Sequence, residues 1–141
     1  MKHILQIFAT ALLLQTLCFA QNEAPDVVKR GFDAYLKSGA QAGIDEWIKG
    51  SPVQNDQSGR LQLVGGLTTI ESAYGNFTGW ELIRVVILSA STRRVYVVAK
   101  YEKGPLFMSF DCFKSTEWII PTLDLNTKAN LVLPSNLLGG Q

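Results

Sequence analysis

Histidine and cysteine are nearly absent from this 141-residue chain, which has one histidine and two cysteines. His3 and Cys18 both lie in the first 20 residues, a segment that we expect to be removed. The remaining chain keeps one cysteine, Cys112, and no histidine. These absences exclude nucleophile pairs that need a histidine base and zinc sites built from cysteine and histidine. We therefore predict no cofactor and no metal site.

Residues 1–20 have the pattern of a secretory signal peptide. Lys2 gives a positive start, residues 4–17 form an apolar run, and Ala20 places a small residue at the expected cleavage site. Cleavage just after it predicts an exported protein, either periplasmic or secreted.

An uncleaved membrane anchor is the rival interpretation of this segment. The apolar run is short for a membrane span and is interrupted by Gln6 and Gln15, so cleavage is favoured. No later segment has the length and apolarity of a membrane span, and we predict none after cleavage.

Residues 21–141 are long enough for one domain with one core. The full chain has 13 lysines and arginines against 12 aspartates and glutamates, and cleavage removes Lys2. The formal charge of the mature chain is therefore near zero. Nothing in this balance favours nucleic acid or an anionic membrane surface as a partner, and we predict neither.

The first half of this domain has helical periodicity. Pro25 suits a first helical turn, and an apolar stripe then continues to a stop at Gly39. A second short helix ends at Gly50. A third is predicted over residues 56–74, with Gly65 weakening its middle.

The second half reads as strands. Four are predicted, at residues 80–89, 94–102, 105–114 and 117–126. Lys103-Gly104 and Ser115-Thr116 are the expected two-residue turns between the last three strands. The segment from Lys128 to Gln141 is expected to form a loose C-terminal tail.

These turns predict a register in which one sheet face is apolar. The predicted pairs on that face include Tyr101 with Leu106 and Cys112 with Ile119. Cys112 is expected to be a buried free thiol. Pro121 cannot donate a ladder hydrogen bond, so the last strand is expected to be an edge or to be bulged there.

The opposite face is expected to be half polar but rich in aromatic side chains. Asp111, predicted opposite Tyr96, and Asp124 both point outward in this register. The aromatic residues are expected either to form a subunit interface or to be covered by the C-terminal tail. The predicted dimer interface consists of Tyr96, Phe107, Phe113 and Trp118.

Helices gathered on one side of an antiparallel sheet predict an α+β fold. The chain resembles the NTF2-like (cystatin-like) superfamily in residues 32–39 (FDAYLKSG), in Trp47 with residues 49–52 (KGSP), and in Trp118. The resemblance implies a cone in which helices pack on a curved four-stranded sheet and enclose a pocket. Some members of the superfamily are isomerases or cyclases with a pocket carboxylate and hydroxyl, and others bind ligands or dimerise. Its short strand between the second and third helices has a poor counterpart in residues 51–56.

Four residues are candidates to line such a pocket. Tyr101 is the one residue of the apolar face with a strong polar group, and it would donate a hydrogen bond to an apolar ligand. Trp47, Met108 and Phe110 would line the cavity, although each also fits an ordinary core.

No carboxylate lies on the apolar face in the predicted register, so we predict no catalytic residue. The expected function is non-catalytic binding of a small apolar ligand or a protein partner, such as an envelope protein, by an exported homodimer. Two alternatives stay open. One is a small isomerase or hydrolase with an aspartate base and a tyrosine donor. The other is a structural envelope-associated domain without a cavity.

Overall fold

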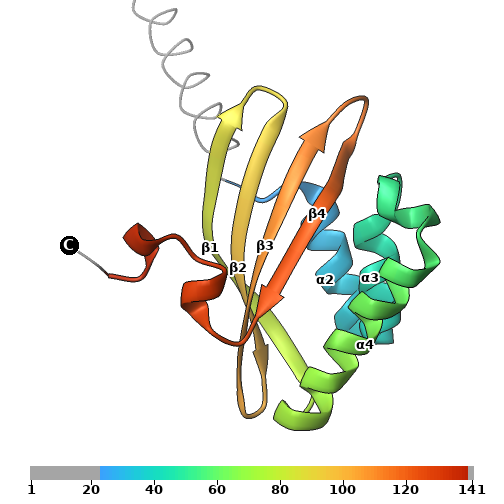
Figure 1. The fold of residues 1–141 in the computed structure, drawn as a ribbon, viewed down its shortest axis with the longest axis vertical. Coiled ribbons are helices and arrows are strands. Elements are labelled where there is room, and N and C mark those ends of the chain that lie inside the picture. Colours follow the sequence, from blue (N-terminus) through green and yellow to red (C-terminus); the bar gives the residue numbers. More distant parts are fainter. Residues whose placement is uncertain (1–22, 140–141) are drawn as a thin grey trace, which may run out of the picture.

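The computed structural model describes residues 23–139, so the predicted signal peptide at 1–20 lies outside the described residues. Across these residues the fold is α+β: three α-helices are followed by an open, antiparallel four-stranded sheet. The strands follow one another in chain order across the sheet (Figure 1). The elements are α2 (Asp26–Ser38), α3 (Ala40–Ile48), the 3-10 turn η1 (Pro52–Asn55), α4 (Gln57–Tyr74), β1 (Phe77–Ser89), β2 (Thr92–Tyr101), β3 (Gly104–Lys114), β4 (Trp118–Asn126), η2 (Ala129–Leu131) and η3 (Ser135–Leu137).

The predicted first helix is confirmed, with both of its boundary residues. Pro25 is the N-cap of α2, and its carbonyl accepts a hydrogen bond from Val28. Gly39 ends the helix with φ 87°, a conformation that favours glycine, and its N–H donates to the Tyr35 carbonyl. The same residue is the N-cap of α3, so the two helices form a tight hairpin.

Small residues let α2 and α3 approach closely. A Cβ on Gly31 would overlap Trp47 Nε1, because the indole lies directly against the backbone of α2. A Cβ on Gly43 would lie 2.8 Å from Tyr35 Cβ. Trp47 is fully buried in this contact and donates a 3.1 Å hydrogen bond to the Val28 carbonyl.

The third helix is also confirmed. Asp56 caps α4 by accepting a 3.0 Å hydrogen bond from the Gly59 N–H. Only Leu67 of this helix is fully buried, so α4 packs more loosely than α2 or α3. The segment before it, where the superfamily usually has a strand, forms the 3-10 turn η1.

The register between β2 and β3 differs from the prediction by two residues. Tyr101 pairs with Gly104 and not with Leu106, so the turn consists of residues 102 and 103. Its position follows from contacts with the end of α4, where the Lys103 N–H donates to the Tyr74 carbonyl at 2.8 Å. A shift of two residues keeps every side chain on its predicted face. The apolar face of these strands is therefore as predicted, with different partners.

The predicted register is wrong at the N-terminal end of β4. A bulge in the β3–β4 ladder lies between the pairs of Asp111 and Phe113, where two residues of β4 oppose Cys112 alone. Beyond the bulge the facing of β4 is reversed. Ile120 is 2% exposed within the core, and Trp118 packs against the same core, so both lie on the helix side instead of the outer face. Pro121 predicted that the last strand is an edge or is bulged there, and β4 is both: it lies at the edge of the sheet and the bulge includes Pro121.

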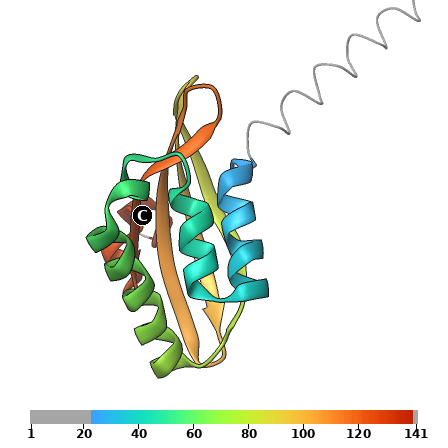
Figure 2. The same cartoon turned by 90° about the vertical axis from the view of Figure 1, so that its right-hand side faces the viewer.

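The three helices lie on one face of the sheet, which we call the inner face (Figure 2). Its core combines α2 and α3 with the inner-face residues of β2 and β3, including Val95, Val97, Met108 and Phe110. Cys112 belongs to this core and is a buried free thiol, as predicted.

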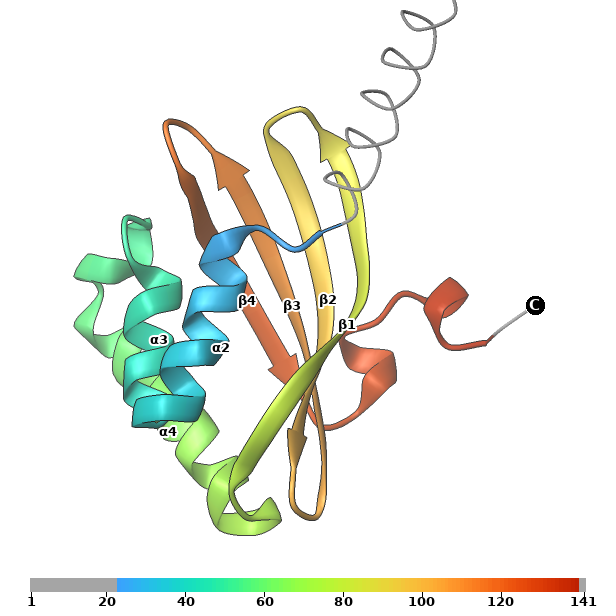
Figure 3. The ribbon, with the colours of Figure 1, turned by 180° about the vertical axis from the view of Figure 1, so that it is seen from behind.

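The C-terminal segment lies on the other side of the sheet, which we call the outer face (Figure 3). This segment contains η2 and η3, and Leu133 between them is 7% exposed. Tyr96 and Ser109 on the outer face are 6% and 8% exposed. We infer that the C-terminal segment covers part of this face within a single chain.

Candidate functional site

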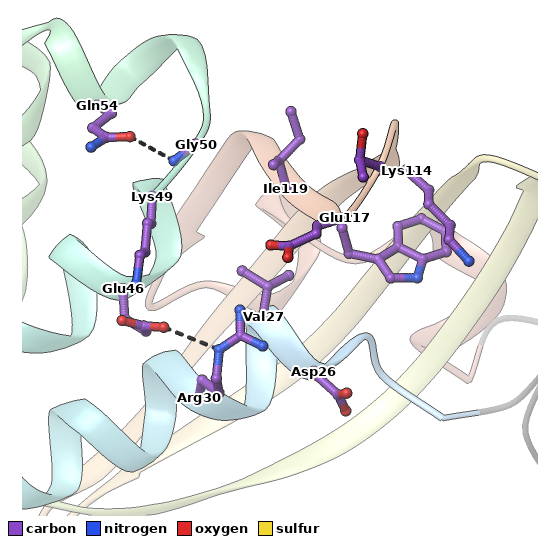
Figure 4. Close-up of a pocket in the computed structure, with 12 residues that line it drawn as sticks. Asp26, Val27, Arg30, Glu46, Lys49, Gly50, Gln54, Lys114, Glu117 and Ile119 are labelled. Atoms are coloured by element: carbon purple, nitrogen blue, oxygen red, sulfur yellow. Dashed lines mark hydrogen bonds and ion pairs between the residues drawn. The ribbon is translucent and has the colours of Figure 1, made fainter.

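An open groove of about 900 Å³ lies at the end of the domain where α2 begins and α3 ends. The β3–β4 hairpin closes its other side (Figure 4). The lining residues are Asp26, Val27, Arg30, Glu46, Lys49, Gly50, Gln54, Lys114, Thr116, Glu117, Trp118 and Ile119. Three separate parts of the chain therefore build one concave surface, the form that ligand sites usually take.

The walls on the helix side are held by polar contacts. Arg30 Nε donates a 3.0 Å hydrogen bond to Glu46 Oε1, an ion pair that joins α2 to α3. Gln54 Oε1 accepts a 2.6 Å hydrogen bond from the Gly50 N–H and fixes the turn after α3. These contacts make the helix side of the groove a preformed wall (Figure 4).

The sheet side of the groove is built around Trp118. The bulge in β4 turns this half-buried indole toward the helices, where it packs on the core. The guanidinium carbon of Arg93 lies 4.9 Å from the ring centroid, and Lys114 Nζ lies 5.9 Å from it. Trp118 therefore offers an aromatic surface with two cations beside it.

The predicted ligand-binding residues lie elsewhere, in the packed core. Trp47, Met108 and Phe110 are fully buried and Tyr101 is 6% exposed. The ring centroids of Trp47 and Phe110 are 5.3 Å apart, and the Phe32 ring packs edge-on against both rings. None of these residues lines the groove. Their role in ligand binding stays a prediction.

A buried pair of hydroxyl groups joins α2 to the end of β2. The hydroxyls of Tyr35 and Tyr101 lie 2.9 Å apart, and Glu71 of α4 is nearby. Burial raises the pKa of Tyr101 to about 12, with the Glu71 charge adding to the rise and the bond to Tyr35 opposing it. Burial, the hydrogen bond to Tyr101 and the charge of Glu71 raise the pKa of Tyr35 still further. Both groups are therefore neutral hydrogen-bonding partners at ordinary pH.

The outer face does not have the predicted cross-strand pair. Asp111 lies opposite Arg94 and not opposite Tyr96, which pairs with Ser109. Two hydrogen bonds of 2.5 and 2.7 Å join the guanidinium to the carboxylate. The bond to Asp111 raises the pKa of Arg94. This is a fork-to-fork ion pair on the face away from the helices.

The predicted dimer residues divide between the two faces. Tyr96 is buried, Phe107 is half-buried and Phe113 is 42% exposed, all on the outer face. Trp118 lies instead in the wall of the groove on the helix side.

Sequence reasoning missed most of the groove. Its charged residues, such as Arg30, Lys49 and Glu117, come from segments far apart in the chain and form no motif. One signal was present: Pro121 correctly indicated an edge or a bulge, and a bulge reverses the facing of the residues on one side of it. Applying that reversal would have brought Trp118 to the helix side.

Residues 23–139 hold no grouping of carboxylate, cysteine or histidine side chains that suits a metal ion. Within the same range, no helix combines the length and apolarity needed to cross a bilayer. No protein-family model, curated protein or solved structure matches the chain.

Proposed function

We propose that this protein is an exported, non-catalytic binding domain of the NTF2-like type, and that its ligand occupies the groove beside Trp118. The order of elements supports the assignment, since three helices precede a four-stranded antiparallel meander. The 3-10 turn η1 stands where the superfamily has a short strand. We therefore propose that the chain is a divergent member of the superfamily, in which the 3-10 turn replaces this short strand.

One observation carries the binding proposal. Trp118 is a large aromatic side chain left half-buried in the wall of an open groove, next to the apolar residues Val27 and Ile119. Most of the other lining residues are charged or polar, so Trp118, Val27 and Ile119 supply the apolar contact that a ligand site needs and the polar groups surround it. The residues around Trp47 are buried from solvent, whereas Trp118 borders an open groove, so we propose the groove as the site instead of the core.

The polar groups of the fold support binding over catalysis. The Tyr101 hydroxyl, the one strong polar group predicted for the inner face, already bonds Tyr35. Asp111 is engaged by Arg94 on the outer face. A general base must reach the substrate proton within hydrogen-bond distance, and an outward aspartate is badly placed for that.

Native mass spectrometry of the exported protein tests the proposal. We expect the wild type to carry a co-purified small molecule, and Trp118→Ala to lose it. Phe113→Ala is the matched control, because Phe113 is an aromatic residue of the same hairpin that lies on the outer face. A ligand retained by Trp118→Ala, or a wild type that is bare after purification and stays bare with cell extract, contradicts the proposal.

We also propose a homodimer, and we place its interface along β1 instead of on the outer face. β1 is an edge strand, so one row of its backbone groups has no partner strand within residues 23–139. Leu82, Ile87 and Leu88 on this strand are 40%, 46% and 57% exposed. An antiparallel pairing of two β1 strands about a two-fold axis would continue the sheet and cover these side chains.

The regular part of β1 sets the extent of this interface. Bulges divide the β1–β2 ladder into two uninterrupted stretches, Gly79–Leu82 and Arg84–Ile87, and the second carries the exposed Ile87. Light scattering after gel filtration is expected to give twice the chain mass for the wild type and the chain mass for Ile87→Lys. Leu36→Lys is the control, since Leu36 is 61% exposed on α2, and it should stay dimeric. A monomeric wild type contradicts the dimer, and a dimeric Ile87→Lys contradicts its placement.

A further inference from the structure

Two cations beside Trp118 form no ion pair with a carboxylate of residues 23–139. Five basic residues within residues 23–139, among them Arg30 and Arg94, form ion pairs with carboxylates. Arg93 and Lys114 form none in the same part of the chain, yet both lie against the Trp118 ring, at 4.9 and 5.9 Å from its centroid. Like charges gathered at one ring repel each other, and an anion between them would relieve that repulsion.

Arg93 also carries an unsatisfied donor. It lies on the inner face, where its backbone pairs with that of the buried Cys112. Its Nε atom is buried and has no hydrogen-bond acceptor in the described part of the chain. Buried donors are nearly always satisfied in folded proteins, and an unsatisfied donor of a charged group is especially unfavourable.

The acidic groups of the groove do not fill this role. Glu46 is held by Arg30 on the helix side. The Glu117 carboxylate points toward Val27 and Arg30, away from the Lys114 ammonium, and Asp26 lies on the far wall (Figure 4). Lys49 adds a further cation to the lining. The lining holds three cations and three anions, and Lys114 is the lining cation that lies against the Trp118 ring.

We propose that the hairpin end of the groove binds the oxyanion of a small organic acid with an apolar body. The indole of Trp118 contacts the apolar body, and Lys114, which lines the groove, binds the charged group. Arg93 lies against the Trp118 ring outside the lining, and the terminal nitrogens of its half-buried guanidinium would complete the contact. An oxyanion would accept hydrogen bonds from the Arg93 guanidinium, and its negative charge would reduce the repulsion between Arg93 and Lys114. This inference rests on the proposed function, since it names the ligand class of the same groove.

Two fluorescent probes of the same shape test the inference on the full-length folded protein. Anilinonaphthalene sulfonate carries a sulfonate on an aromatic frame, and phenylnaphthylamine has the same frame without the charge. We expect the wild type to bind the sulfonate more tightly than the neutral probe. Arg93→Met should weaken sulfonate binding on the order of tenfold, the usual value of a charge-assisted hydrogen bond, and leave the neutral probe unchanged.

The adjacent arginine is the matched control. Arg94→Met removes the same charge from the next residue, but on the outer face where Arg94 pairs with Asp111, and it should leave both affinities unchanged. Lys114→Met should act like Arg93→Met, and Lys103→Met at the opposite end of β3 should not. Circular dichroism confirms that each variant is folded before titration.

The outcomes separate the inference from the proposed function. If Trp118→Ala weakens both probes but Arg93→Met and Lys114→Met leave their affinity ratio unchanged, the groove binds ligands and the anion preference is refuted. If neither probe responds to Trp118→Ala, the groove site itself is refuted. Loss of sulfonate binding alone in Arg93→Met and Lys114→Met supports the inference.

Discussion

Replacing Gly31 by alanine tests how α2 and α3 pack. Glycine weakens the interior of a helix by about 1 kcal/mol relative to alanine, so helix propensity alone predicts that Gly31→Ala stabilises the protein. The structure predicts the opposite. A Cβ at this position would overlap Trp47 Nε1 and Cδ1, and the indole cannot retreat because it is fully buried and packs 4.8 Å from the Phe32 ring and 5.3 Å from the Phe110 ring.

The expected magnitude follows from three contributions. Overpacking a well-filled core costs about 1–3 kcal/mol. Displacing the indole also strains its hydrogen bond to the Val28 carbonyl, a contact worth about 1 kcal/mol. The gain in helix propensity offsets about 1 kcal/mol. We expect a net loss of about 2 kcal/mol, which lowers Tm by roughly 8 °C in a domain of this size.

Gly65→Ala is the matched control for this substitution. Gly65 also lies inside a helix, but a Cβ there would meet nothing within 4 Å. We expect this variant to gain about 1 kcal/mol. Urea unfolding followed by circular dichroism measures both variants. If Gly31→Ala is stabilised to the same extent as Gly65→Ala, the packing of Trp47 against α2 is wrong.

Three further predictions concern the polar groups of the fold. Tyr101→Phe leaves the buried Tyr35 hydroxyl unsatisfied and should cost about 1–3 kcal/mol, whereas adding Tyr35→Phe should recover part of this loss in a double-mutant cycle. The pKa of Tyr101 is raised to about 12 from an unfolded value near 10. The stabilisation by its neutral hydroxyl is therefore complete below about pH 10 and is lost as pH rises toward 12 and beyond. Chemical unfolding should show the free energy of unfolding of the wild type approaching that of the double variant at this high pH. Burial raises the pKa of Cys112 to about 12, so its thiol should react with a disulfide reagent only after unfolding, and rapid reaction of the native protein would contradict its place in the core. Asp56→Ala removes the α4 cap and should lower the free energy of unfolding by about 1 kcal/mol, while an unchanged value would show that Gly59 is satisfied by other means.

The helices could be predicted because their ends depend on local chemistry. Pro25 and Gly39 act through their own backbone preferences, and Asp56 reaches a backbone N–H only three residues away. The two faces of β2 and β3 could be predicted for a similar reason. Side chains alternate along a strand, so the turn placed one residue too late shifted the register by two residues and left both faces intact.

The remaining features depend on contacts between distant segments. The turn at residues 102–103 is set by the Tyr74 carbonyl, which belongs to a helix nearly thirty positions earlier in the chain. The bulge opposite Cys112 reverses the facing of Trp118, and alternation alone contains no information about it. The groove then joins that reversed strand end to α2 and α3, so its lining residues could not be grouped from their order in the sequence.

The most direct test of the account is the response of the tryptophan indole N–H signals to anilinonaphthalene sulfonate in a two-dimensional NMR spectrum. The chain has three tryptophans, and single Trp→Phe variants assign their signals. A ligand in the groove moves the Trp118 signal and leaves that of Trp47, which is buried and bonded to the Val28 carbonyl, in place. Movement of the Trp47 signal with Trp118 unchanged would put the ligand in the core and contradict the central claim.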